Sequence, residues 1–191
     1  MIGDPLTTQS SRSRPIWIYS DGSASTHGQK TGAHAAHILF PDGEVQMVVG
    51  ACSQTKITRM ELSAINQALY YIWAIHEKGG SLDLEIEIVT DSEVTMNGAT
   101  GKNKRGPQNA DIWLQFDSLS ENFKSINFTH VDRNTEAPQA QSDVVAHLFR
   151  VQLEDLLNRV LLHEMFGKMQ LTKETRFDED PLPAQETPHE K

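Results

Sequence analysis

The sequence predicts an α/β fold in which helices cover a five-stranded mixed sheet. Two observations carry this prediction. Segments with the period of a strand and segments with the period of a helix follow one another in the order β-β-β-α-β-α-β-α. The first three strands are joined by short turns, whereas the last two need helical crossovers. We therefore expect three antiparallel strands followed by two parallel ones.

Three short strands are predicted first. Residues 15–20 are aromatic and β-branched, and they end at Asp21-Gly22-Ser23, which is typical of a turn. Residues 33–40 are apolar, and a β pattern resumes over residues 45–49. Asp42-Gly43 lies between these two segments and predicts a hairpin.

The remaining elements alternate between helix and strand. Leu62, Ile65, Leu69 and Ile72 recur at steps of three and four residues, which predicts an amphipathic helix over residues 59–78, ended by Gly79-Gly80. The elements expected after it are a strand over 84–90, a helix over 111–123, a strand over 126–131 and a long helix over 143–169.

Length and composition predict one globular domain. The chain has 191 residues, of which 38% are hydrophobic and 23% charged. We expect a disordered segment over residues 1–14, a domain over 15–169 with an extended last helix, and a disordered acidic tail over 170–191. The net charge of -9 argues against extensive phosphate binding, but a basic run at Lys102, Lys104 and Arg105 stands apart from the acidic tail.

The composition also excludes several classes of protein. No apolar stretch approaches the roughly 20 residues of a membrane helix, and the polar N-terminal residues do not form a secretory signal. A cytoplasmic location is expected. Cys52 is the only cysteine, which excludes an internal disulfide and a cysteine-based zinc cluster. A metal cluster of His27, His34 and His37 is also rejected, because His34 and His37 lie three apart on a predicted strand and face opposite sides.

Four carboxylates stand where a metal-dependent nuclease needs them. Asp21 and Asp91 follow β-rich segments, and Glu61 and Asp143 lie near the start of helical ones. Phosphodiester hydrolysis can use two divalent ions about 3.5 to 4 Å apart, and hard ions take carboxylate ligands. The alternative is that each is an ordinary acid: Asp21 in a turn, Asp91 and Asp143 as helix caps, and Glu61 in a first turn. With 26 acidic residues, composition does not decide between them.

Four strings of residues occur in a specific succession. They are Asp21-Gly22-Ser23, Arg59-Met60-Glu61-Leu62, Thr90-Asp91-Ser92 and Asp143-Val144-Val145-Ala146. In this order they resemble the type 1 ribonuclease H family, over residues 16–150. The resemblance implies a ribonuclease H-like fold and cleavage of the RNA strand of RNA/DNA hybrids, leaving 5′-phosphate and 3′-hydroxyl ends. It also implies that Asp21, Glu61, Asp91 and Asp143 are the catalytic ligands of two Mg²⁺ or Mn²⁺ ions.

The same resemblance indicates which residues contact the substrate. The family reads the hybrid through its backbone and its 2′-hydroxyls. The residues expected to make these contacts are Gly22, Ser23, Thr58, Arg59, Ser92, Lys102, Lys104, Arg105 and Arg133. The basic run is the candidate grip for the DNA phosphates, with a solvated turn as the alternative.

The chain departs from the family pattern at several positions. Arg133 stands where many members have a loop histidine, so the chain is closer to the subset that lacks this histidine and the long basic handle. Arginine steadies phosphate charge but does not shuttle protons near neutral pH. His130 is expected to be a strand-end side chain rather than its replacement. Thr58 replaces an asparagine, and Glu93 adds a fifth carboxylate.

Alternatives exist for the long last helix and for the function. Trp113 is expected in the core rather than as a stacking platform, and the long last helix either packs on its own domain, pairs with a second chain or docks a protein partner. The alternative functions are a nuclease of this fold that acts on double-stranded RNA or a DNA junction, and a binding or scaffold protein of low activity.

Overall fold

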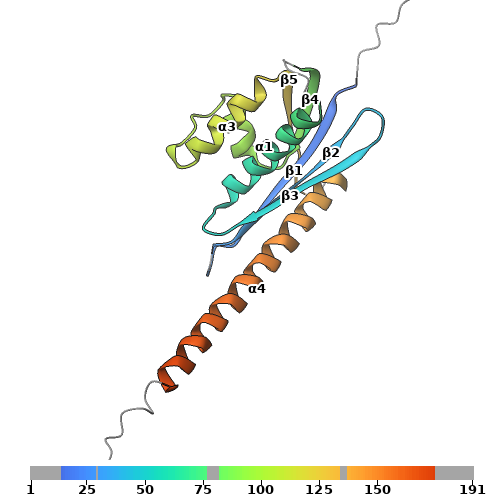
Figure 1. Cartoon of the computed structure of the whole chain (residues 1–191). Coiled ribbons are helices and arrows are strands. Elements are labelled where there is room, and N and C mark those ends of the chain that lie inside the picture. The colour runs from blue at the N-terminus through green and yellow to red at the C-terminus, as the bar shows by residue number, and fades with distance from the viewer. Residues whose placement is uncertain (1–13, 29, 77–81, 134–136, 175–191) are drawn as a thin grey trace, which may run out of the picture. The chain divides into compact units, whose positions relative to one another are not determined.

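The computed structural model describes residues 14–28, 30–76, 82–133 and 137–174 (Figure 1). The chain divides into two compact units, one ending at Glu154 and the other beginning at Asp155. The described part of the second unit is helical and is the continuation of the last helix. The predicted domain boundaries themselves stay predictions, and residues 1–13 and 175–191 lie outside the described part of the chain.

A five-stranded mixed sheet forms the centre of the first unit. Its strand order is β3-β2-β1-β4-β5. β1 (Ile16–Ala24) pairs antiparallel with β2 (Gly32–Leu39), which pairs antiparallel with β3 (Val45–Cys52). On its other side β1 pairs parallel with β4 (Leu82–Thr90), and β4 pairs parallel with β5 (Phe123–His130). The prediction of three antiparallel strands followed by two parallel ones is confirmed.

The turn predicted at Asp21-Gly22-Ser23 is wrong. β1 continues through these residues, because Asp21 pairs with Ala35 and the ladder with β2 runs on to Ala24. The local residues are typical of a turn, but the pairing with a full-length neighbouring strand decides the conformation. Asp21 is therefore held inside a paired strand.

The predicted hairpin between β2 and β3 is confirmed. Gly43 has φ of 91°, in the region that favours glycine, and its N–H donates to the Phe40 carbonyl over 3.0 Å. The Phe40 N–H donates to the Glu44 carbonyl over 2.9 Å and closes the turn.

The helices differ from the predicted ones mainly at their ends. They are α1 (Ile57–His76), α2 (Glu93–Ala99), a short 3-10 turn η1 (Pro107–Asn109), α3 (Ala110–Ser120) and α4 (Ala137–Glu174). The short α2 is missing from the predicted order. α3 ends three residues before the predicted 123, because Phe123 instead begins β5 and is buried. The predicted glycine stop of α1 lies outside the described residues.

The start predicted for the last helix is also wrong. α4 begins at Ala137, six residues before Asp143, and continues past 169 to Glu174. Pro138 lies in its first turn, where a missing N–H leaves no hydrogen bond unmade. Asp143 is therefore in the body of the helix and does not cap it.

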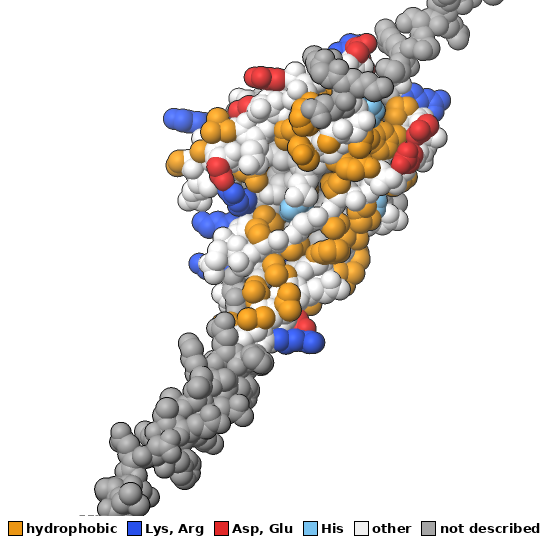
Figure 2. Space-filling model, in the orientation of Figure 1, with side chains coloured by type: hydrophobic (Ala, Val, Ile, Leu, Met, Phe, Trp, Pro, Cys, Tyr) orange, Lys and Arg blue, Asp and Glu red, His pale blue; other side chains and the backbone are white. Residues whose placement is uncertain are grey.

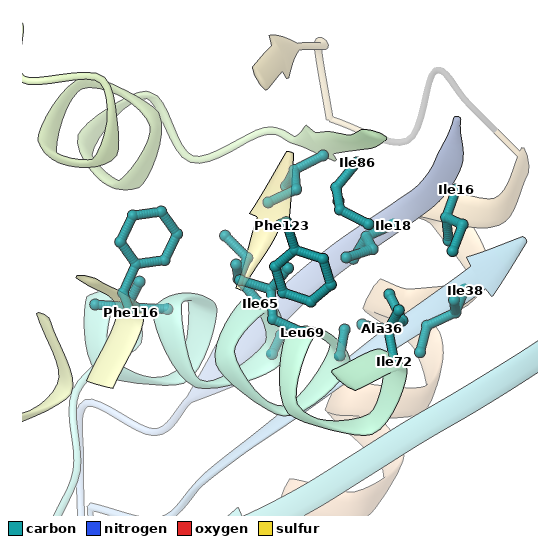
Figure 3. Close-up of a cluster of buried hydrophobic side chains, with 14 of the residues drawn as sticks. Ile16, Ile18, Ala36, Ile38, Ile65, Leu69, Ile72, Ile86, Phe116 and Phe123 are labelled. Carbon is teal, nitrogen blue, oxygen red and sulfur yellow. The ribbon is translucent and has the colours of Figure 1, made fainter. Parts of the chain in front are cut away.

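The core lies between the sheet and α1, with α3 packed beside them (Figure 3). Its buried aliphatic side chains include Ile16, Ile18, Ile38, Leu62, Ile65, Leu69, Ile72, Ile86 and Ile88. Trp113 is 6% exposed and belongs to this core, as predicted. On the visible face of the space-filling view, charged side chains lie mostly at the margins of the described surface (Figure 2).

The first part of α4 packs on the opposite face of the sheet from α1. On β2, His34 lies against Gly50 and beside Gln67 of α1, whereas the His37 ring is hydrogen-bonded to Ser142 of α4. The prediction that these two histidines face opposite sides is confirmed. No helix among the described residues is long and apolar enough to span a membrane.

Candidate active site

Three of the four predicted carboxylates meet at one place. One oxygen each of Asp21, Glu61 and Asp91 lie within 4.8 Å of one another. Asp21 is carried by the central strand β1, and Asp91 follows directly after β4, its parallel neighbour. Glu61 is the fifth residue of α1, beyond the first turn. The parallel pairing of β1 with β4 and the packing of α1 on β1 bring the three side chains together.

Gly22 makes the approach between β1 and α1 close enough for this cluster. A Cβ at this position would lie 2.6 Å from the Glu61 backbone nitrogen and 2.9 Å from the Met60 carbonyl carbon. These are backbone atoms that cannot swing aside, so only glycine fits here. The contact places Asp21 and Glu61 side by side.

Burial and mutual repulsion raise the pKa values of two of these carboxyls, Asp21 and Glu61. Asp21 is 3% exposed, and burial, together with the charges of Asp91 and Asp143, raises its pKa to about 8. Burial likewise raises the pKa of Glu61 to about 7, although the hydroxyls of Ser92 and Thr95 and the charge of Arg133 act in the opposite direction.

The free oxygens in the cluster fit a cation. Asp21 Oδ1 accepts the Gly22 N–H over 2.6 Å, but Asp21 Oδ2 and Glu61 Oε2 are buried without a hydrogen-bond partner among the described residues. Buried acceptors are normally satisfied. A divalent ion takes oxygen ligands of this kind and would cancel their repulsion.

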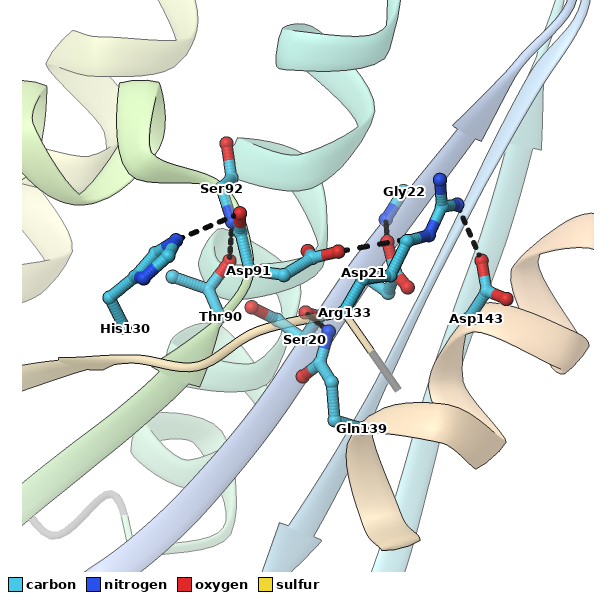
Figure 4. Close-up of polar contacts among 10 residues, drawn as sticks. All are labelled: Ser20, Asp21, Gly22, Thr90, Asp91, Ser92, His130, Arg133, Gln139 and Asp143. Atoms are coloured by element: carbon cyan, nitrogen blue, oxygen red, sulfur yellow. Dashed lines mark hydrogen bonds and ion pairs between the residues drawn. The ribbon is translucent and has the colours of Figure 1, made fainter. Parts of the chain in front are cut away.

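Asp143 lies at the edge of the cluster and is ion-paired to Arg133 (Figure 4). Arg133 Nη2 donates to Asp143 Oδ1 over 3.0 Å, and its Nε is 3.9 Å from Asp91 Oδ2. The guanidinium is 66% exposed, whereas Asp91 and Asp143 are 14% and 24% exposed. Asp143 is close enough to Asp21 for its charge to raise the pKa of that carboxyl.

The segment around Asp91 is ordered by its neighbours. Ser92, not Asp91, caps α2, because its hydroxyl accepts the Thr95 N–H over 3.3 Å. His130 is the last residue of β5, and its Nε2 is 3.2 Å from the Asp91 carbonyl, which can only accept, so this nitrogen carries the proton. His130 is thus at the strand end, as predicted. Its ring anchors the Asp91 backbone.

The predicted substrate contacts lie in varied settings. Thr58, Lys104 and Arg105 line one cleft of about 350 Å³. Arg59 makes a two-bond ion pair with Asp111, with N–O distances of 2.9 and 2.6 Å, and the pKa of Asp111 is lowered to about 2 mainly by this contact.

Ser23 and Arg105 make contacts within the protein. The Ser23 hydroxyl accepts from Arg150 Nε over 3.1 Å. Arg105 stacks on the Trp113 ring at 4.4 Å, donates to the Gly98 carbonyl over 2.9 Å and pairs with Asp117. Substrate binding by Ser23 and Arg105 stays a prediction, as it does for the exposed Lys102.

Sequence reasoning missed two buried polar residues next to the site. Gln139 and Ser142 of α4 are fully buried, and they donate to the carbonyls of Ser20 and Tyr19 over 2.8 and 2.9 Å. Two polar residues shortly before a candidate ligand are only a weak indication of such contacts in the sequence, because their partners lie more than a hundred positions away. A larger cavity, about 820 Å³, lies between β3, α1 and α3 and is lined by none of the carboxylates.

Fold and site together define a ribonuclease H-like protein with a cluster of carboxylates that could bind a metal ion. Comparison with known proteins agrees. The sequence matches the RNase H family over residues 13–147, and it is 30% identical over 125 residues to the ribonuclease H of Ehrlichia chaffeensis, spanning 59% of this chain and 78% of that protein. The chain therefore belongs to the RNase H family, a family of nucleases.

Solved structures support the fold. The LC11-RNase H1 isolated from compost superposes with a TM-score of 0.60 at 20% identity, covering 73% of this chain and 97% of that one. The RNase H1 of the archaeon Halobacterium salinarum gives 0.57 at 19% identity, covering 70% and 96%. LC11-RNase H1 has also been solved in complex with an RNA/DNA hybrid, and that structure gives 0.56 at 18% identity, covering 66% and 92%.

Proposed function

We propose that this protein is an endonuclease that hydrolyses the RNA strand of RNA/DNA hybrids with two divalent ions, Mg²⁺ or Mn²⁺, leaving 5′-phosphate and 3′-hydroxyl ends. The observation that carries the proposal is the cluster of Asp21, Glu61 and Asp91, whose oxygens lie within 4.8 Å in a member of this family. The structure of LC11-RNase H1 with a hybrid supports this choice of substrate.

The carboxylates of this chain have definite roles in such a reaction. Asp21, Glu61 and Asp91, with Asp143 beside them, would hold the ions. When bound, the ions supply an activated water and stabilise the leaving oxygen. The paired strand that carries Asp21 keeps its carboxylate in one place, so the ligands need little rearrangement.

Arg133 is proposed to bind the substrate phosphate. It is two-thirds exposed, so the guanidinium can turn from Asp143 to a phosphate at little cost. Because arginine stays protonated near neutral pH, Arg133 contributes charge rather than proton transfer. The chain thus works without the loop histidine.

The DNA phosphates of the hybrid are proposed to bind along the cleft of Thr58, Lys104 and Arg105. Lys102 belongs to the same basic run and is proposed to contribute to this binding. Gly22 and Ser23 lie on β1 with Asp21, Arg59 lies on α1 with Glu61, and Ser92 follows Asp91 in the chain. These four residues are proposed to face the RNA strand. We also propose a cytoplasmic location, and a protein partner or a second copy of the chain bound to the last helix.

Two other functions have weaker support. Double-stranded RNA or a DNA junction would fit the same ligands, since a fold does not define a substrate. A scaffold protein would have no reason to keep buried carboxylates that repel one another, which costs stability without metal.

The test is cleavage of an end-labelled RNA/DNA hybrid in Mg²⁺ and in Mn²⁺, beside double-stranded RNA, a DNA junction and single strands. Asp91→Asn keeps the shape of the side chain but removes its charge, and we expect it to abolish cutting. Hybrid-specific cutting that Asp91→Asn eliminates would support the proposal. Cutting that survives the substitution, or none with either ion, would refute it.

A further inference from the structure

Two buried side chains tie α4 to the backbone of β1 just ahead of Asp21. Ser142 Oγ is 2.9 Å from the Tyr19 carbonyl oxygen, and Gln139 Nε2 is 2.8 Å from that of Ser20. Both side chains are fully buried. Their acceptors are the two residues that precede Asp21, and Ser142 directly precedes Asp143.

His37 of β2 completes this contact. Its Nδ1 lies 2.9 Å from Ser142 Oγ. The Ser142 hydroxyl has one proton, and it donates to the Tyr19 carbonyl over 2.9 Å, with the Pro138 carbonyl at 3.1 Å as a weaker second acceptor. The His37 ring must therefore donate from Nδ1 to the hydroxyl. Burial lowers the pKa of His37, so a neutral ring with its proton on Nδ1 suits this position.

The contacts of Asp143 itself do not hold it in place. Its hydrogen bond to Arg133 involves a side chain that is 66% exposed, and exposed ion pairs constrain geometry weakly. The rotation of α4 about its axis decides where Asp143 points, and the buried bonds of Gln139 and Ser142 to β1 restrict that rotation near this residue.

We propose that His37, Gln139 and Ser142 are positioning residues that fix Asp143 beside Asp21, so that it can serve as a ligand. This inference rests on the proposed function, because it assigns a role in holding the divalent ions. Among the described residues, no hydrogen bond joins any of the three to the four carboxylates. They act through the backbone of β1 and through the helix.

The test compares ion binding with stability in the full-length chain. Ser142→Ala removes the hydroxyl, His37→Leu removes the N–H donor while keeping a buried side chain, and Ser142→Thr restores the hydroxyl. Asn66→Ala is the matched control, because Asn66 is 5% exposed and its Nδ2 donates to the Ile112 carbonyl over 2.9 Å, joining α1 to α3 away from α4. Circular dichroism checks each fold, and calorimetry measures Mn²⁺ binding without nucleic acid.

Outer residues that orient metal ligands typically change metal affinity by about 10- to 100-fold when replaced. We expect Ser142→Ala and His37→Leu to weaken Mn²⁺ binding about tenfold and to raise the Mn²⁺ concentration for half-maximal cleavage similarly, with KM for the hybrid within about twofold. Ser142→Thr should restore both. Asn66→Ala should lower stability and leave Mn²⁺ binding unchanged.

Different results separate the two proposals. Wild-type Mn²⁺ affinity in Ser142→Ala and His37→Leu would overturn the positioning role alone, as would an equal loss in Asn66→Ala. A wild-type chain that neither binds Mn²⁺ nor cuts the hybrid would overturn the proposed function with it. If Ser142→Ala does not fold, His37→Leu decides.

Discussion

Asp21→Asn is expected to make the metal-free protein more stable at neutral and alkaline pH while abolishing cleavage. Burial and neighbouring charges raise the pKa of Asp21 from 3.8 to about 8, so the folded protein holds a proton that the unfolded chain releases. The loss of folding stability caused by the Asp21 carboxyl is absent below about pH 4, grows as the pH rises, and is complete above about pH 8. Asparagine carries no charge and can still accept the Gly22 N–H.

The size of the effect follows from the pKa. At about 1.36 kcal/mol for each pKa unit, the raised value corresponds to at most roughly 6 kcal/mol. Relaxation and water penetration around a buried charge reduce this, so we expect a gain of about 2 to 4 kcal/mol at pH 8.5. For a protein of this size that is a rise of roughly 6 to 12 °C in Tm.

The assay is denaturant unfolding in chelator at pH 4.5, 7 and 8.5, for wild type and Asp21→Asn. The difference in the free energy of unfolding should be small at pH 4.5 and largest at pH 8.5, and Mg²⁺ should narrow it by stabilising only the wild type. Glu121→Gln, at an exposed acid outside the site, controls for the loss of net charge. Equal stability of wild type and Asp21→Asn at pH 8.5 would refute the reasoning.

Three further outcomes are expected. Gly22→Ala should destabilise the protein by about 1 to 3 kcal/mol and reduce cleavage, since its Cβ would meet the Glu61 backbone nitrogen at 2.6 Å; thermal melts and the hybrid assay measure both. Arg105→Ala should lower the melting temperature, because its guanidinium lies 4.4 Å from the Trp113 ring centroid. Mn²⁺ binding at pH 6.5 should release protons, because Asp21 must ionise to become a ligand; calorimetry in buffers of different ionisation enthalpy detects this.

Each of these outcomes has a control. Gly106→Ala adds a methyl group with no atom within 4 Å and should leave stability unchanged. Lys104→Ala should leave the melting temperature nearly unchanged but weaken hybrid binding and reduce its salt dependence by about one phosphate contact. Proton release that is equal in Asp21→Asn and wild type would contradict the third expectation.

The sequence predicted the elements of this fold well, because strand and helix periods are local properties. The failures are non-local. Asp21-Gly22-Ser23 has turn-forming residues, yet pairing with β2 keeps it in a strand. The sequence predicts a start of the last helix at Asp143, but α4 begins six residues earlier, and those residues include the buried Gln139 and Ser142.

For the candidate site, the sequence predicts the carboxylates but not the contacts that surround them. The family motifs identified the carboxylates, and the structure brings Asp21, Glu61 and Asp91 together. No local pattern indicated that Arg133 would lie between Asp91 and Asp143, or that His37 of β2 would contact α4. Such contacts depend on how distant elements dock.

The central place of β1 in the sheet bears on how the protein loses its activity. Strands with neighbours on both sides open only when the whole domain unfolds, whereas surface contacts open by local fluctuation. The amides of residues 17–19, where β1 pairs with both β2 and β4, should therefore be among the slowest to exchange with deuterium, and that of Arg133 among the fastest. A mild denaturant would then free Arg133 and the residues around it first. β1, which carries Asp21, would stay in place until global unfolding.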